Sequence, residues 1–134
     1  MSVSKGIASL VERRAGGRCE YCRMHQALQG ATFHVEHILP GILGGLTIPD
    51  NLAWACPGCN LHKSNRIESL DPEMGISVPL FNPRTQVWLE HFQFVNRLVI
   101  GLTPTGRATV AILDLNQPRR LLIRQAEEMF GLFP

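Results

Sequence analysis

The chain has 134 residues, of which 45 % are hydrophobic, enough for one domain with a core and too few for a second full domain. Its formal charge is only +2, too small to hold a polyanion by net attraction alone. No segment approaches the roughly 20 apolar residues that cross a bilayer, and residues 1–17 contain no apolar stretch of signal-peptide length, so we expect an intracellular, cytoplasmic protein with no membrane segment.

The basic residues are unusual in kind and in grouping. Eleven of the 13 are arginine, whose planar guanidinium pairs well with phosphate oxygens. Several of them fall into two groups along the sequence. The second group fits one face of an amphipathic helix with acidic partners as well as it fits a phosphate-binding patch. The groups are Arg13, Arg14, Arg18 and Arg23, and then Arg119, Arg120 and Arg124.

The first half of the chain predicts a helix, two strands and a second helix. Apolar residues at helical spacing predict a helix over 4–14, which the pair Gly16-Gly17 ends. The alternating segment "ATFHVEHI" predicts a strand, and "NLAWA" predicts a second one. Pro57 suits the first turn of a helix over roughly 58–69.

The second half predicts short strands and two helices. Pro79 and Pro83 flank an extended segment, and residues 88–102 are strand-like. Thr103 and Pro104 predict the N-cap and first turn of a helix that runs to about Leu115, and a last helix spans roughly 118–130. Neither part carries obvious chemistry, so we expect both to pack around the first half.

Four cysteines occur as two Cys-x-x-Cys pairs, a pattern that places four thiolates around one zinc ion. Disulfides are weak alternatives in a reducing compartment, and a redox motif needs only one pair. The 33 residues between the pairs exceed the usual spacing, so a shared zinc would hold a large loop in a fixed frame. The four are Cys19, Cys22, Cys56 and Cys59.

The segment "FHVEHILPGILGG" lies inside that loop. In an extended strand His34 and Glu36 share one face and His37 points the other way, unless the strand ends there. A carboxylate can bind a hard cation, and an imidazole can take a proton from water. Asn60 follows Cys59 directly, so a cysteine knuckle would aim its amide toward the strands.

The motifs "CEYC", "VEHILP", "DNLAWACPGCN" and "HK" together resemble the HNH endonuclease family, in its McrA-like branch with four zinc cysteines. His37 precedes Asn51 by 14 residues, and Asn51 precedes Asn60 by nine, which is similar to the family's spacing. The resemblance implies an α+β fold with a ββα-metal core over about 16–68. An N-terminal helix and a C-terminal extension over about 69–134 would complete one domain, residues 1–134.

The resemblance also implies roles for individual residues. His37 would be the general base that activates water, and Asn51 would hold the loop and strands. Glu36 and Asn60 would bind one divalent cation for phosphodiester hydrolysis, with DNA more expected than RNA. Glu36 replaces the family's usual aspartate or histidine, which leaves magnesium, manganese and nickel open as the catalytic ion. Candidate contacts to substrate phosphate are His34, His62, Lys63 and Arg66.

Two other classes stay open at this stage. One is a zinc-stabilised nucleic-acid-binding module that has lost catalysis, and the other is a scaffold that uses the ββα unit only as a frame. The sequence does not fix the oligomeric state.

Overall fold

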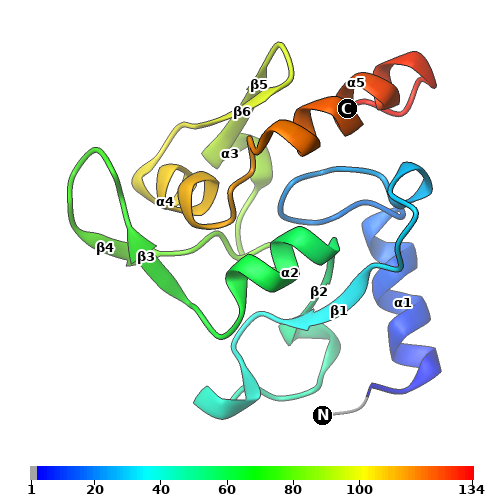
Figure 1. The fold of residues 1–134 in the computed structure, drawn as a ribbon. Helices are drawn as coiled ribbons and strands as arrows, with labels where there is room; N and C mark the ends of the chain where they lie inside the picture. Colours follow the sequence, from blue (N-terminus) through cyan, green and yellow to red (C-terminus); the bar gives the residue numbers. More distant parts are fainter. Residues whose placement is uncertain (1–2) are drawn as a thin grey trace.

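The computed structural model describes residues 3–134, which fold into a mixture of short helices and strands (Figure 1). Among these residues, no helix combines the length and the apolar character needed to cross a membrane. The helices are α1 (Lys5–Ala15), α2 (Pro57–Lys63), α3 (Trp88–His91), α4 (Pro104–Ile112) and α5 (Pro118–Met129). The strands are β1 (His34–His37), β2 (Leu52–Ala55), β3 (Glu68–Leu70), β4 (Ser77–Pro79), β5 (Phe92–Val95) and β6 (Leu98–Gly101).

The predicted ββα unit is present. Strands β1 and β2 pair antiparallel, with His34 opposite Ala55 and His37 opposite Leu52, and α1 and α2 pack against them (Figure 1). The Ser4 side chain caps the start of α1, and Gly16 ends it in the left-handed conformation with φ of 65°. Both features follow from the preference of serine for N-caps and of glycine for positive φ.

The second helix is shorter than the sequence predicts. Helix α2 ends at Lys63, because Ser64 takes a positive φ of 49°, and the last two residues of the predicted helix belong instead to strand β3. Glu68 and Leu70 instead pair with Pro79 and Ser77 of β4. Pairing of β3 with β4, the next strand along the chain, therefore overrides the local preference for helix.

The extension supports the first half of the chain. The expected strand-like segment 88–102 begins with the short helix α3 before the β5–β6 hairpin, and the helix expected to reach Leu115 ends at Ile112. Helix α5 lies close to its predicted bounds. Trp88 Nε1 donates to the carbonyl of Tyr21 at 2.9 Å, and the two buried rings of Trp88 and Phe92 lie 4.9 Å apart.

One hydrophobic cluster includes side chains from both halves. Val11 of α1 and Leu52 of β2 belong to it, together with Phe92 and Leu113 of the extension, and all four are fully buried. Polar contacts also join the halves. Besides the Trp88–Tyr21 hydrogen bond, they include the Arg84–Glu20 ion pair, the bond from Arg18 Nη2 to the Leu132 carbonyl and the bond from the His25 amide to Glu127 Oε2.

Helix α4 approaches its neighbours so closely that a glycine is required at one contact. A Cβ on Gly106 would lie 2.1 Å from the carbonyl oxygen of His91, whereas a Cβ on Gly6 of α1 would meet no atom within 4 Å. We therefore expect Gly106→Ala to lower the free energy of unfolding by about 1–3 kcal/mol, as overpacking does.

The matched variant Gly6→Ala should raise the free energy of unfolding by about 0.5–1 kcal/mol, because alanine loses less backbone entropy in a helix. Urea unfolding followed by circular dichroism measures both variants. Equal effects of the two substitutions would show that the α4 contact is not as close as described.

Candidate active site

Four thiols meet at the centre of the first half of the chain. The sulfurs of Cys19, Cys22, Cys56 and Cys59 all lie within 4.8 Å of one another, all four residues are buried, and none forms a disulfide. In each Cys-x-x-Cys turn the second backbone N–H points at the first sulfur, at 3.5 Å from Cys22 to Cys19 and 3.4 Å from Cys59 to Cys56. The cluster is therefore arranged to hold a metal ion.

The geometry and the donors fit zinc. Tetrahedral zinc with bonds of about 2.3 Å separates its sulfur ligands by about 3.8 Å, and the sulfurs of Cys22 and Cys56 lie 3.7 Å apart. Burial raises the pKa of the Cys22 and Cys59 thiols, so ionising all four groups together requires a cation among them. The predicted zinc site is supported by this arrangement.

An arginine from the extension lies beside the thiols. Arg120 belongs to helix α5, and its Nη1 lies 3.2 Å from the Cys59 sulfur. Burial alone would lower the pKa of Arg120, but the neighbouring cysteine sulfurs raise it above its usual value. A zinc bound by four thiolates carries a net charge of −2, and Arg120 offsets part of that charge.

The cysteine cluster fixes the start of α2 and the end of β2, and a polar pocket opens beside them. Its volume is about 390 Å³, and its lining includes Glu36, His37 and Asn60. These are three of the four residues proposed as catalytic from the resemblance, and the fourth, Asn51, does not line the pocket. Glu36 and His37 are adjacent in β1, and both line this pocket together with Val35.

His37 is held by a neighbouring hydroxyl. Its Nε2 lies 2.9 Å from Thr47 Oγ1, within hydrogen-bond distance, and the side chain is half-buried. One nitrogen of the imidazole is therefore engaged with the protein, and His37 also lines the pocket.

Asn51 closes the loop that follows β1. Its Oδ1 accepts from the Leu39 amide at 2.8 Å, and its Nδ2 donates to the carbonyls of Leu39 and Leu46 at 3.0 and 2.9 Å. The Asn51 carbonyl also accepts from the Ile38 amide. A Cβ on Gly45 would lie 1.7 Å from the Leu39 carbonyl oxygen, so the tight loop also requires this glycine.

Glu36 is buried with two partners. Tyr21 donates its hydroxyl to Glu36 Oε2 at 3.0 Å, and the Lys63 ammonium lies 2.5 Å from Oε1. Burial raises the pKa of Glu36, while Lys63 and Tyr21 oppose that shift. Lys63 also donates to the Ile38 carbonyl at 3.0 Å and is only 1 % exposed, so it does not face solvent as the predicted phosphate contact requires.

The other candidate phosphate contacts are scattered. His34, His62 and Arg66 are exposed. His62 does not line the His37 pocket but a different one, together with Arg119 and Arg120. The structure thus brings Glu36, His37 and Asn60 to one pocket, places Asn51 in the loop beside it, and leaves the proposed phosphate contacts apart.

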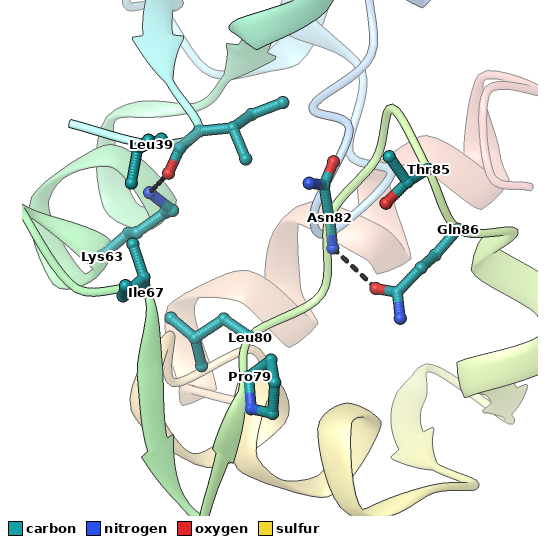
Figure 2. A pocket seen from close by; sticks show the side chains of 9 residues that line it. Leu39, Lys63, Ile67, Pro79, Leu80, Asn82, Thr85 and Gln86 are labelled. Carbon is teal, nitrogen blue, oxygen red and sulfur yellow. Dashed lines mark hydrogen bonds between the residues drawn. The ribbon is translucent and has the colours of Figure 1, made fainter. Parts of the chain in front are cut away.

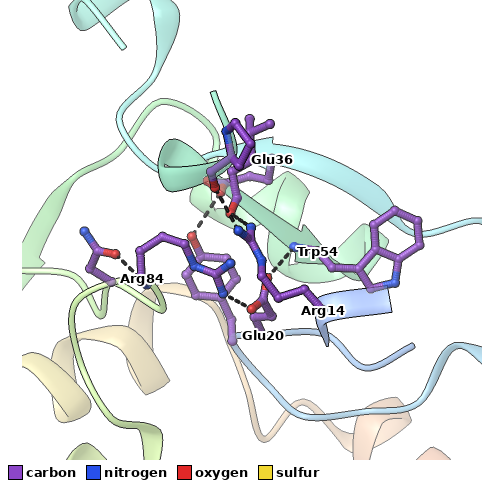
Figure 3. Close-up of polar contacts among 9 residues, drawn as sticks. Arg14, Glu20, Glu36, Trp54 and Arg84 are labelled. Carbon is purple, nitrogen blue, oxygen red and sulfur yellow. Dashed lines mark hydrogen bonds and ion pairs between the residues drawn. The ribbon is translucent and has the colours of Figure 1, made fainter. Parts of the chain in front are cut away.

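Several supporting residues were missed from the sequence. Glu20 accepts from the Trp54 amide at 2.8 Å and pairs with Arg84, so it ties β2 to the extension (Figure 3). Tyr21 and Thr47 contact Glu36 and His37 across 15 and 10 residues of sequence. Tyr21 lies between two cysteines, which places it near the site, but no sequence pattern identifies Thr47 or Glu20.

Comparisons with known proteins agree with the resemblance noted in the sequence. Residues 19–66 match the HNH endonuclease family, which confirms the predicted family over that segment. The Septu protein PtuB of Bacillus thuringiensis is 27 % identical over 114 residues, which are 81 % of this chain. The chain spans 40 % of that relative's length. No solved structure matches the chain significantly.

Removal of the metal should unfold the protein. We expect about one zinc ion per chain by elemental analysis, and we expect both chelation and Cys22→Ser to lower the melting temperature sharply, because metal binding contributes directly to folding in such sites.

The conservative variant Met24→Leu, at a buried position two residues after Cys22, should keep its zinc and lose less than about 1.5 kcal/mol. A wild-type protein that contains no zinc, or that melts at the same temperature with and without chelator, would contradict a structural metal.

Proposed function

We propose that this protein, which carries an HNH endonuclease domain at residues 19–66, is a metal-dependent nuclease that hydrolyses phosphodiester bonds in DNA. The observation that carries the proposal is the meeting of Glu36, His37 and Asn60 in one polar pocket beside the cysteine cluster. These residues come from a strand end and a helix start that the two knuckles hold in place.

In this proposal His37 takes the proton from the attacking water. Its Nε2 is engaged with Thr47 Oγ1, so we assign Nδ1 as the atom that accepts the proton of the water. If the Thr47 hydroxyl accepts from Nε2–H, Nδ1 carries no proton before the reaction and is able to accept one. Asn51 keeps the loop closed and so fixes the direction of the imidazole. A proton acceptor positioned in this way contributes about 10²–10⁴-fold to a reaction.

Glu36 and Asn60 are the residues that would hold the divalent cation. One buried oxygen of Glu36, Oε1, has no hydrogen-bond partner with acceptable geometry, although the Lys63 ammonium is close to it. An oxygen of this kind, together with an amide oxygen, suits magnesium or manganese. A bound cation would stabilise the negative charge that develops on the phosphate and on the departing 3′-oxygen.

The substrate and the setting are also part of the proposal. With a net charge of only +2, we expect binding to depend on local arginine groups rather than on overall charge. We propose a cytoplasmic location, where DNA is accessible and where the buried thiols stay reduced.

One observation favours a second candidate, a zinc-stabilised nucleic-acid-binding module without catalysis. The carboxylate of Glu36 already has a cationic partner in Lys63 and a hydroxyl partner in Tyr21. If these contacts never open, Glu36 is a structural residue and the pocket binds no cation.

Mutation of the proposed base distinguishes the two candidates. We expect His37→Ala to lower plasmid nicking at least about 100-fold in magnesium, manganese or nickel, because the attacking water loses its proton acceptor. Zinc content and melting temperature should stay near the wild-type values, since His37 is only half-buried.

The exposed residue Gln93 of β5 provides a control, and Gln93→Ala should nick DNA at the wild-type rate. Equal nicking by His37→Ala and wild type would contradict the role of His37. Binding of DNA without nicking in any of the three metals would favour the second candidate.

A further inference from the structure

A buried ammonium group lies against the proposed cation ligand. Lys63 is the last residue of α2, and its Nζ contacts Glu36 Oε1 at 2.5 Å, the Ile38 carbonyl at 3.0 Å and the His37 carbonyl at 3.4 Å. The side chains of Lys63 and Glu36 are only 2 % and 4 % exposed. Buried lysines are rare unless they are paired, so this contact is a built feature of the site.

The contact with Glu36 is close without being a well-formed hydrogen bond. Oε1 is buried and has no hydrogen-bond partner of acceptable geometry among residues 3–134, even though the ammonium lies beside it. Tyr21 holds the other oxygen of the carboxylate at 3.0 Å. The carboxylate of Glu36 is therefore engaged at both oxygens, by the Lys63 ammonium at Oε1 and by the Tyr21 hydroxyl at Oε2.

The two partners of this ion pair line different pockets. Glu36 lines the polar pocket that it shares with His37 and Asn60. Lys63 lines a neighbouring pocket of about 360 Å³. Figure 2 shows Lys63 and Ile67 on one side of that neighbouring pocket and Asn82, Thr85 and Gln86 on the other. The polar residues of this pocket could receive the ammonium if it left Glu36.

We propose that Lys63 is a resident counter-ion of Glu36 and that it competes with the divalent cation for this carboxylate. The protein thus keeps Glu36 neutralised when no cation is bound and sets a lower cation affinity than Glu36 and Asn60 alone would give. This inference rests on the proposed function, because it assigns Glu36 to the cation site. Lys63 is a positioning residue in this account and not a catalytic one.

The alternative is that the pair only links α2 to β1. Lys63 donates to the carbonyls of His37, the last residue of β1, and of Ile38, which follows it, so its removal would loosen that contact in either case. The two possibilities differ in how removal of the lysine charge changes the affinity for a divalent cation. A competing counter-ion predicts that removal of the lysine charge tightens cation binding, whereas a simple link predicts no gain.

Manganese binding to the zinc-loaded protein, measured by electron paramagnetic resonance, tests the proposal directly. Lys63→Met should bind manganese at least about tenfold more tightly than wild type, because a positive charge beside the ligand oxygen is removed. The only other lysine of the chain is Lys5, which is exposed, and Lys5→Met should match the wild type. An unchanged or weaker affinity in a folded Lys63→Met variant would overturn the proposal.

Thermal melting covers the case in which Lys63→Met folds poorly. Manganese should raise the melting temperature of Lys63→Met more than that of wild type, because the cation replaces the lost positive charge beside Glu36. The double variant Glu36→Gln/Lys63→Met should lose this gain together with the carboxylate. An equal manganese effect in wild type and Lys63→Met would overturn the proposal.

The nicking assay distinguishes a failure of the proposed role of Lys63 from a failure of the proposed nuclease activity. If wild type nicks DNA and His37→Ala does not, while Lys63→Met shows no gain in manganese affinity, then only the role of Lys63 fails. If wild type nicks no DNA in any metal, the proposed function fails whatever the affinity of Lys63→Met.

Discussion

The structure depends first on the cluster of four cysteines. Two knuckles separated by 33 residues meet there, and the chain between them contains β1, the Asn51 loop and β2. Closing so long a loop would cost conformational entropy, which binding of one metal ion offsets. Since Asn60 follows the last cysteine directly and Glu36 and His37 lie at the end of β1, the same closure brings all three to one pocket.

Charges are distributed around this cluster in a way that the net charge does not reveal. Arg120 lies against the thiols, Lys63 balances Glu36, and Glu20 pairs with Arg84 from the extension. Buried charges of this kind persist only when they are paired. The extension therefore does more than cover the core, because two of these three pairs need its arginines.

The sequence predicted the parts of the site that depend on spacing. The two Cys-x-x-Cys pairs, and the 14 and nine residues that separate His37, Asn51 and Asn60, carry the resemblance to the HNH endonuclease family, and that resemblance implied the fold and the site. The end of α2 was misplaced because β3 gains a partner in β4, 7 residues beyond it. The inward direction of Lys63 and the contacts of Thr47 and Tyr21 depend on where β1 lies against α2, and no local pattern carries that information.

We propose that the frame held by the cysteine cluster carries a second, separate cation site at Glu36 and Asn60. A crystal structure of the zinc-loaded protein soaked in manganese, with anomalous scattering recorded for both metals, tests it most directly. The account predicts zinc among the four sulfurs and manganese between Glu36 and Asn60, beside His37. Manganese absent from that pocket in a crystal where zinc fills the cysteine cluster would contradict the account.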